Sequence, residues 1–405
     1  MTNKALSGVK VVELGEFVAA PFCAKLLADL GADVIKVEDP QGGDISRSMG
    51  PFPDDLPHPE RSGLHLYLNT SKRSITLNVH TIDGQAIFKR LISDADVLVE
   101  SNAPGEMDAL GIGYETLRKC NPGLIMTSIT PFGQTGPHRN YKAYYLNTFH
   151  AGGEGFLLPG GLGWLLYEDR PPLKAGGFLG EYDSGVAAGV ATLAALLWKG
   201  AGNEGQQIDI SQQEALVTLS RVEMTSYPNR GKVESRGSRS WPIAGLVQCK
   251  DGFVQIMPLV EDMWTRLAEV VGGREMAEDR RFETPTGRRE HAEEINSRID
   301  QWALQHTKNE IYDLLQAAGC PTGIVSTAED LLKSEQLAAR GYFQELDHPE
   351  LGRLKYPTVP YKLSATPIQL ERAAPRLGEH NEEIYCDRLG YSRHELTRMR
   401  GMGLI

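Results

Sequence analysis

The chain lacks a long apolar run. Its most apolar stretch, residues 186–198, is about 13 residues long, whereas a membrane-spanning helix needs roughly 20. The start, MTNKALSGVKVVEL, contains no apolar core of the length that a signal peptide requires. We therefore expect a cytoplasmic protein that does not insert into a membrane.

Cysteines are few, and acidic residues outnumber basic ones. The 5 cysteines form no CxxC pair and no Cys/His spacing typical of metal ligands, so we expect reduced thiols and no metal. Lysine and arginine number 42 against 53 acidic residues, which gives a net charge of −11. This charge argues against a nucleic-acid partner. It does not exclude phosphates, because a few local cations and backbone N–H groups are enough to hold them.

Strand-like and helix-like segments alternate through the first 130 residues. The β-branched runs lie at 9–14, 33–37, 74–79, 95–100 and 124–129, and helix-compatible stretches lie between them at 21–30, 83–93 and 114–118. The alternation predicts an α/β fold with a doubly wound parallel sheet that is covered on both faces. A GxGxxG fingerprint is absent after the first strand, where Gly15, Glu16 and Phe17 stand, so a nicotinamide dinucleotide is not expected.

The character of the chain changes after about residue 220. Two strand-like runs, 246–249 and 253–257, flank a turn, and helical segments follow at 262–271, 288–305 and 308–318. Because 405 residues exceed what one core usually fills, we predict a large domain at 1–221 and a smaller α+β domain at 222–330. Residues 331–405 are predicted to link the small domain back to the large one. The helix at 186–199 is apolar nearly all round and is expected to be buried.

Seven short motifs, in the same order, resemble those of family III CoA-transferases of the formyl-CoA and carnitine–CoA type. They are LADLGADVIKVE at 27–38 with the following PQGGD, LNTSKRSI at 68–75, ADVLVE at 95–100, FGQTGP at 132–137, LAALL at 193–197, GQQIDIS at 205–211 and PTG at 321–323. The resemblance implies a Rossmann-like large domain, a smaller domain and two interlocked chains. These would form a homodimer or pair with a related second subunit. It also implies that coenzyme A moves from an acyl-CoA to a free carboxylic acid, as a substrate and not as a resident cofactor.

The resemblance also points to a nucleophile. Family members use an aspartate four residues ahead of a glycine, at the start of the buried helix. Counting back from Gly185 leads here to Glu181, which carries the same carboxylate one methylene farther from the backbone. Asp183 is the alternative, and a chain without a working nucleophile is the third reading.

Coenzyme A contacts are carried over in the same way. Family positions place Val18 and Ala19 at the thiol end, Leu77 and His80 along the nucleotide, Lys142 and Tyr144 near the reacting centre, and Ser101 and Asn102 after the fourth strand. Lys72 and Arg73 are the nearest cationic pair for a phosphate. Each of these basic residues has an equally weighted alternative as a solvated surface charge.

The identity of the acids is only hinted at. The glycine-rich loop of formyl-CoA transferases is replaced by Trp241-Pro242-Ile243-Ala244-Gly245, so oxalate and formyl-CoA are not expected as substrates. The segment 156–167 (FLLPGGLGWLLY) favours a bulky or hydrophobic acyl group, and ordinary core packing explains it equally well.

Three other functions remain open on this scaffold. An α-methylacyl-CoA racemase needs a His and an Asp around the α-carbon, and Tyr144 and Glu181 occupy those positions here. A CoA-dependent lyase or dehydratase is the second alternative. The third is a non-catalytic CoA-binding homologue, alone or as the silent partner subunit of an active chain.

Overall fold

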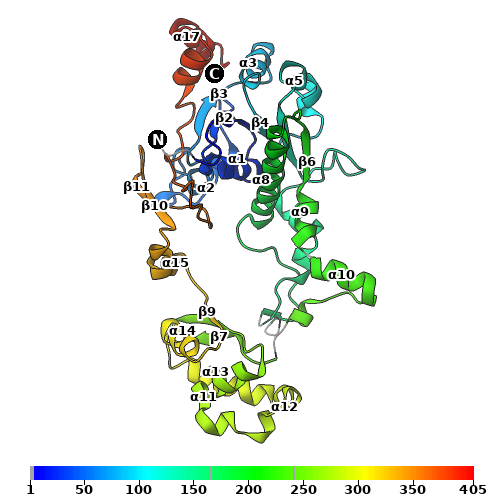
Figure 1. Ribbon diagram of the computed structural model, residues 1–405, viewed down its shortest axis with the longest axis vertical. Helices are drawn as coiled ribbons and strands as arrows, with labels where there is room; N and C mark the ends of the chain where they lie inside the picture. Colours follow the sequence, from blue (N-terminus) through cyan, green and yellow to red (C-terminus); the bar gives the residue numbers. More distant parts are fainter. Residues whose placement is uncertain (1–3, 162, 165–166, 220, 240–241) are drawn as a thin grey trace. The chain divides into compact units, whose positions relative to one another are not determined.

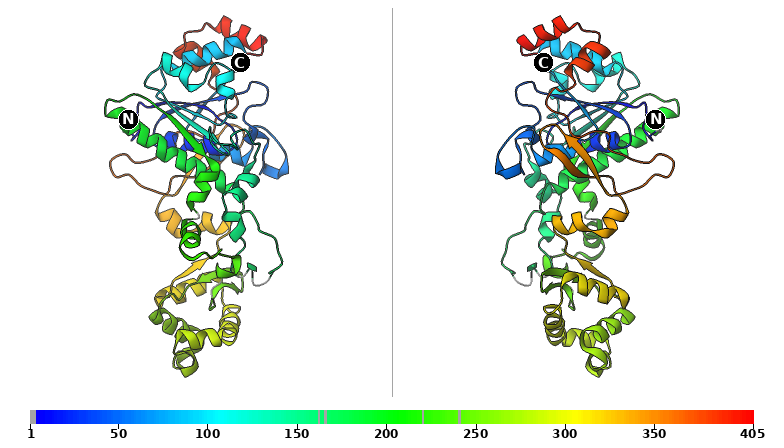
Figure 2. Two further views of the ribbon diagram at one scale, coloured as in Figure 1. Left: turned by 90° about the vertical axis from the view of Figure 1, so that its right-hand side faces the viewer. Right: turned by 90° about the vertical axis from the view of Figure 1, so that its left-hand side faces the viewer.

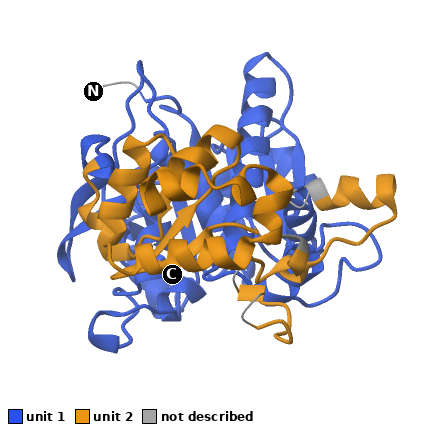
Figure 3. Cartoon of the chain, turned by 90° about the horizontal axis from the view of Figure 1, so that it is seen from below, with its two compact units in different colours: residues 1–154, 174–221, 336–405 blue, residues 155–173, 222–335 orange. Residues whose placement is uncertain are grey.

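The structure, a computed structural model, describes residues 4–161, 163–164, 167–219, 221–239 and 242–405. The chain divides into two compact units, coloured separately in Figure 3. Unit 1 consists of residues 1–154, 174–221 and 336–405, and unit 2 consists of residues 155–173 and 222–335.

Unit 1 is built on a six-stranded sheet in which every strand runs parallel to its neighbours (Figure 1). In the order β3-β2-β1-β4-β5-β6, the strands are Arg73–Thr76, Asp33–Glu38, Lys10–Leu14, Val97–Glu100, Ile125–Thr130 and Gln207–Ser211. The first five strands confirm the predicted runs. The sixth, β6, was not predicted because its polar residues do not read as a buried strand.

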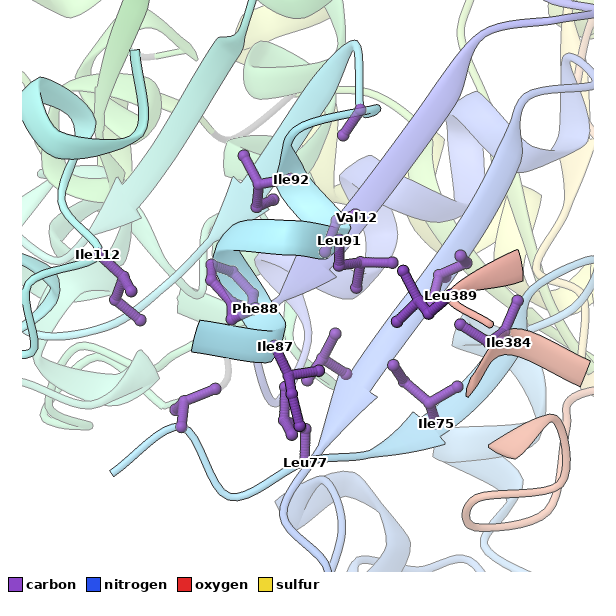
Figure 4. Packing of buried hydrophobic residues seen from close by; sticks show 14 of the residues in the cluster. Val12, Ile75, Leu77, Ile87, Phe88, Leu91, Ile92, Ile112, Ile384 and Leu389 are labelled. Atoms are coloured by element: carbon purple, nitrogen blue, oxygen red, sulfur yellow. The ribbon is translucent and has the colours of Figure 1, made fainter. Parts of the chain in front are cut away.

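Successive residues of a strand point to opposite faces of the sheet, and both faces are covered here. Val11 enters a core with helices α1 (Ala19–Asp29) and α8 (Leu179–Gly200). Its neighbour Val12 enters the opposite core, which contains residues of α3 (Ile82–Ile92), α5 (Tyr114–Cys120), the π-helix η6 (Glu383–Arg388) and α17 (Arg393–Gly401). Figure 4 shows Phe88 and Leu91 of α3 in this second core, together with Ile384 and Leu389. The predicted doubly wound α/β architecture is therefore confirmed.

Helices α1 and α8 approach each other closely through glycine. A Cβ at Gly185 would lie 2.8 Å from the carbonyl oxygen of Ala19 and 3.2 Å from Cβ of Phe22. Any side chain at this position would force the helices apart, so the start of α8 is fixed against the start of α1. Helix α8 begins seven residues earlier than predicted, and it leaves Val190 63% and Leu197 79% exposed. The expectation that this helix is buried all round is wrong for the single chain, because only one of its faces covers the sheet.

The edge strand β3 is closed by residues from the far end of the chain. The side-chain oxygen of Asn381 accepts the N–H of Thr76 at 2.9 Å, and the hydroxyl of Tyr385 donates to the Thr76 carbonyl at 2.7 Å. Farther on, the Leu404 carbonyl accepts the N–H of Asn78 at 2.8 Å. Figure 2 shows α17 beside α3 in both views.

Shorter elements complete unit 1. They are the 3₁₀ turns η1 (Ile45–Ser48) and η2 (Pro53–Asp55), the helices α2 (Gly63–Leu68), α4 (Glu106–Ala109), α6 (Tyr145–Ala151), α9 (Gln212–Leu219) and α16 (Glu335–Ala339), and the antiparallel hairpin β10 (Phe343–His348) and β11 (Gly352–Pro357). This hairpin lies in the predicted return segment, where prolines concealed its strands. The 3₁₀ turn η3 (Glu154–Leu157) begins at the last residue of the first segment of unit 1.

Unit 2 contains an antiparallel sheet in the order β7-β8-β9, formed by Gly245–Cys249, Gly252–Ile256 and Thr322–Ile324. Its helices are α10 (Arg221–Arg230), α11 (Glu261–Ala277), α12 (Pro285–Glu290), α13 (Ala292–Ala303), α14 (Lys308–Ala317) and α15 (Ala328–Lys333), with 3₁₀ turns η4 (Arg236–Arg239) and η5 (Arg280–Phe282). The hairpin predicted at 246–257 is confirmed. The single helix predicted at 288–305 is instead two helices, because His291 leaves helical geometry between them.

Candidate active site

The strand order of unit 1 reverses between β1 and β4, which lie side by side. Open parallel sheets bind their ligands beyond the carboxyl ends of the strands at such a point. Strand β1 is followed there by the loop Gly15–Val18, and β4 is followed by Ser101 and Asn102. The two loops are bonded to each other, because the N–H of Glu16 donates to Oγ of Ser101 at 3.0 Å. The structure thus brings the predicted residues Val18 and Ser101 to one place.

The first turn of α8 joins these loops through aromatic contacts. The ring of Phe178, the N-cap residue of α8, lies 4.8 Å from the ring of Phe17 and 5.0 Å from the ring of Tyr145. One turn later, the ring of Tyr182 meets that of Phe22 edge-on at 4.9 Å. The predicted nucleophile, Glu181, therefore belongs to a helical turn that packs on the loop after β1.

Glu181 is a buried carboxyl group with only 3% of its surface exposed. Its backbone N–H donates to the Phe178 carbonyl at 3.1 Å, which places the side chain in the first turn of the helix. Burial raises the pKa of Glu181 to about 7, against the lowering effect of Lys174 and with a further small rise from Asp183. This shift brings the titration of the Glu181 carboxyl group toward neutral pH, and its ionised form can act as a nucleophile.

Lys174 supplies a positive charge near Glu181. Its ammonium group lies 5.2 Å from the centre of the Tyr145 ring and donates to the carbonyl oxygens of Ala175, at 2.6 Å, and Gly177. Two of its three N–H donors are used by these carbonyls. The sequence analysis missed Lys174, Tyr145 and Phe178. The position of Lys174, five residues before the helix, was the one signal in the sequence that could have indicated a cation near Glu181.

Asp183, the alternative nucleophile, has a different environment. Residues two apart on a helix project about 200° apart, so Asp183 does not share the direction of Glu181. Its Oδ2 atom is buried and has no hydrogen-bond partner among the residues that the structure describes. Burial, followed by the nearby charge of Glu154, raises the pKa of Asp183.

Other residues expected near the thiol end of coenzyme A also lie here. Val18 is fully buried beside Leu64 and Leu68, and Ala19 begins α1. Asn102 ties the loop after β4 to the sheet, because its backbone N–H donates to the Glu100 carboxylate at 2.7 Å. These residues lie just beyond the carboxyl ends of β1 and β4.

Lys72 and Arg73 are already paired within the protein. The fully buried Lys72 ammonium donates to a carboxylate oxygen of Glu13 at 2.7 Å, to the Pro21 carbonyl at 2.8 Å and to Oδ1 of Asn69 at 2.8 Å. These three bonds use all of its N–H donors, so none is left for a phosphate. Arg73 is paired with the carboxylates of Asp33 and Glu383. We therefore do not retain either residue in the proposed CoA site.

The remaining predicted contacts lie in different settings. Leu77 is a core residue of the face that carries α3, whereas His80 and Lys142 are exposed. Tyr144 is 79% exposed at the N-cap of α6, and it is the next residue, Tyr145, that packs on Phe178. Their roles in binding remain predictions.

The two segments from which the substrate was predicted, 156–167 and 241–245, lie partly outside the described residues. The residues concerned are Leu162, Leu165, Leu166 and Trp241. Within the described part of the segment 156–167, Phe156 and Tyr167 are exposed and Leu157 is buried. None of the described helices is long and apolar enough to cross a membrane. In the same described residues, no three His, Cys, Asp or Glu side chains gather as metal ligands would.

Comparison with known proteins identifies the family of the chain. The family model of CoA-transferase family III matches residues 6–381. The chain is 34% identical to a succinyl-CoA–D-citramalate CoA-transferase of Chloroflexus aurantiacus, over 99% of this chain and 98% of the relative. It is 32% identical to a formyl-CoA:oxalate CoA-transferase of Streptomyces coelicolor, with both chains fully covered.

A solved structure shares the same architecture. A CaiB/BaiF family protein from Brucella suis superposes with a TM-score of 0.84 and 28% identity, over 95% of this chain and 100% of the other. The family resemblance found in the sequence motifs is confirmed. This chain belongs to CoA-transferase family III.

Proposed function

We propose that the protein is an acyl-CoA:carboxylate CoA-transferase that works through a thioester between Glu181 and coenzyme A. One observation supports this most directly. A buried carboxyl group with a pKa of about 7 lies in the first turn of α8, against the loop at the reversal point of the sheet. A carboxylate in an apolar setting is poorly solvated and therefore more reactive toward a thioester carbon than one in water.

The reaction balances in two exchanges. The Glu181 carboxylate attacks the acyl carbon of the acyl-CoA, the C–S bond breaks, and a mixed anhydride and a CoA thiolate result. The thiolate then attacks the side-chain carbonyl carbon of Glu181 and displaces the donor acid as a carboxylate. The acceptor acid reverses both steps, which conserves the energy of the thioester.

Oxyanions form at each attack and need hydrogen-bond donors. The first N–H groups of an α-helix have no partner within the helix, and α1 begins at Ala19 in the loop that packs on the first turn of α8. We assign the backbone N–H groups of Val18 and Ala19 to this role. Their position agrees with the expectation that they line the thiol end of coenzyme A.

The acids remain to be identified. The relatives described above carry the names of succinyl-CoA, D-citramalate, formyl-CoA and oxalate. Most of these acids are dicarboxylic, and Lys174 places a cation near Glu181 where a second carboxylate would be favoured. We therefore propose succinyl-CoA as the first donor to test, with small dicarboxylic acids as acceptors.

We further propose that the chain works as an interlocked homodimer in the cytoplasm. The apolar residues Val190, Leu197 and Trp198 of α8 are more than half exposed in the single chain, which supports a partner on this helix. A related second subunit is the alternative. Light scattering of the purified protein distinguishes a monomer of 44.5 kDa from a dimer, and purification of the protein expressed alone tests the need for a second subunit.

The covalent mechanism is tested by mass spectrometry. The protein is incubated with succinyl-CoA, and its intact mass is measured. A second portion is reduced with borohydride and digested, and peptide mapping then locates the modified residue. A CoA-sized adduct that maps to Glu181, is absent in Glu181→Gln and persists in the matched variant Asp183→Asn supports the proposal. An adduct on Asp183 would show that Asp183 is the nucleophile. Transfer of coenzyme A between acids without any adduct would contradict the thioester mechanism.

A further inference from the structure

Three consecutive residues of the loop after β1 are each held by a different side chain. The carbonyl oxygen of Gly15 accepts a hydrogen bond from the Lys36 ammonium at 2.9 Å. The N–H of Glu16 donates to Oγ of Ser101 at 3.0 Å, and the N–H of Phe17 donates to Oδ1 of Asp44 at 3.0 Å. We call Lys36, Asp44 and Ser101 the loop clamp.

The middle of this loop is strained. Phe17 has a φ of +71°, a left-handed conformation that is unfavourable for a residue with a side chain. Such strain persists only where the surroundings hold it, and it is concentrated at functional sites. In this conformation the Phe17 ring packs on Phe178, the cap of the helix that carries Glu181.

The clamp is stiff because its charged members are buried and paired. The Lys36 ammonium lies 2.7 Å from Oδ2 of Asp44 and 2.6 Å from Oε1 of Glu13, and neither side chain of the Lys36–Asp44 pair is more than 1% exposed. Asp44 also accepts the N–H of Ser46 at 2.7 Å. Removing Lys36 would leave the buried Asp44 carboxylate without its cation, whereas Lys36 would keep Glu13 if Asp44 were removed.

We propose that the loop clamp positions the catalytic turn. Lys36, Asp44 and Ser101 keep Phe17 in its left-handed conformation. Its ring then fixes the start of α8, and the same loop presents the N–H groups of Val18 and Ala19. This inference rests on the proposed function and adds to it three positioning residues that touch no reacting atom.

A purely structural role is the competing explanation, and the chain offers a matched control for it. Glu38 belongs to the same buried charge network and pairs with Arg47 at 2.7 Å and with Oγ of Ser74 at 2.6 Å. It also accepts the N–H of Asp44, but its bonds go to none of the residues Gly15–Phe17. Glu38→Gln therefore removes a buried negative charge, keeps a side-chain oxygen for the Asp44 N–H, and breaks none of the three bonds to Gly15, Glu16 and Phe17.

The first test compares rates of single-turnover adduct formation. We expect Asp44→Ala to slow formation of the Glu181 adduct at least 10-fold, since displacement of reacting groups by about 1 Å can cost 100-fold. Asp44→Asn keeps an oxygen for the Phe17 N–H, so we expect its rate to lie between those of Asp44→Ala and wild type. We expect Ser101→Ala to form the adduct more slowly than wild type without loss of thermal stability. We expect Glu38→Gln to lower the melting temperature but to leave the rate within 3-fold. Equal slowing by Asp44→Asn and Glu38→Gln, or no slowing in Ser101→Ala, would overturn the proposal.

The second test does not depend on transferase activity. Amide hydrogen exchange is measured on peptides that cover residues 15–22 and 178–185 of the full chain. We expect faster exchange in both peptides for Asp44→Asn and Ser101→Ala, and unchanged exchange for Glu38→Gln. If wild type forms no adduct while both peptides respond, the proposed function fails and the clamp stands. If only the first peptide responds, the loop does not position α8 and the inference is wrong.

Discussion

The ring of Phe178 meets the ring of Phe17 nearly edge-on, with 4.8 Å between their centroids and 72° between their planes. This contact joins the helix that carries the candidate nucleophile to the loop that follows the first strand. Edge-to-face pairs of this kind contribute roughly 0.5–1.5 kcal/mol beyond the area that they bury. The start of the helix that carries the candidate nucleophile therefore packs directly on this loop.

The rate of adduct formation is expected to rise with pH around neutrality. Burial raises the pKa of Glu181 to about 7, and only the ionised carboxylate attacks a thioester. About a tenth of the protein carries this ion at pH 6 and about nine tenths at pH 8, by the definition of a pKa. Single-turnover rates at constant ionic strength should show this increase and then level off. A profile that is flat from pH 5 to 8 would show that Glu181 titrates far below its expected range.

The same burial predicts that Glu181 costs stability at high pH. The folded protein holds the Glu181 proton up to about pH 7, whereas the unfolded chain releases it near 4.5, so folding becomes less favourable as pH rises through this window. At about 1.4 kcal/mol per pKa unit, the difference amounts to on the order of 3 kcal/mol. Glu181→Gln should therefore melt at a higher temperature than wild type at pH 8 and at nearly the same temperature at pH 4.5. A lower melting temperature at pH 8 would contradict a desolvated carboxyl group.

Lys174 is expected to lower the midpoint of the pH–rate profile of adduct formation. Its positive charge lowers the pKa of Glu181, so Lys174→Met should move the midpoint of the pH–rate profile upward by about half a unit to one unit. Lys174→Arg keeps the charge and should leave the midpoint unchanged. The shift is measured on adduct formation with one acyl-CoA at saturation. Equal midpoints for the Met and Arg variants would mean that the ammonium group does not act on Glu181.

Replacing Lys72 should affect stability and not binding of coenzyme A. Lys72→Met leaves the buried Glu13 carboxylate with Lys36 as its remaining cation, and we expect the unpaired buried oxygen to cost about 1–3 kcal/mol. Denaturant unfolding should show this loss. Calorimetric titration of the folded variant with coenzyme A should give the affinity of the wild type. A selective loss of affinity for coenzyme A over its dephospho form would instead return Lys72 to the phosphate site.

Replacing two glycines of α8 by alanine should have different effects on the stability of the protein. Gly185→Ala places a Cβ 2.8 Å from the Ala19 carbonyl oxygen, and we expect it to cost about 1–3 kcal/mol. Gly200→Ala meets nothing within 4 Å, and its better helix propensity should make it neutral or slightly stabilising. Thermal melts of the two variants test the closeness of α1 and α8. Equal melting temperatures would show that the helices can separate at no cost.

The sequence predicted the sheet well because its central strands are nearly continuous apolar runs. The stretches 97–99 (VLV) and 124–126 (LIM), for example, are apolar on both faces, as a strand buried between two helical layers usually is. Strand β6 and the hairpin β10–β11 were missed, because polar residues alternate in the first and prolines surround the second. Their pairing depends on neighbours that are distant in the chain.

The candidate site was predictable only in part. Counting from Gly185 pointed to Glu181, whose role stays a prediction, and the switch from β1 to β4 explains why the loops that carry Val18 and Ser101 meet. The pairing of Lys72 with Glu13 was not predictable, because residues 59 positions apart meet only after the sheet has formed. For the same reason, nothing in the sequence marked Phe17 and Phe178 as a pair.

The closure of strand β3 by residues near the end of the chain has a consequence for biosynthesis. Thr76 receives its partner Asn381 from 305 positions downstream, and all of unit 2 lies between them in the chain. A ribosome therefore releases all six strands of the parallel sheet and a complete second unit while the outer edge of β3 is still uncovered. Uncovered strand edges recruit other strands, so the nascent chain passes through an interval in which aggregation competes with folding. We expect the yield of native protein to depend on the speed of translation and on chaperones that protect this edge until residue 381 has emerged.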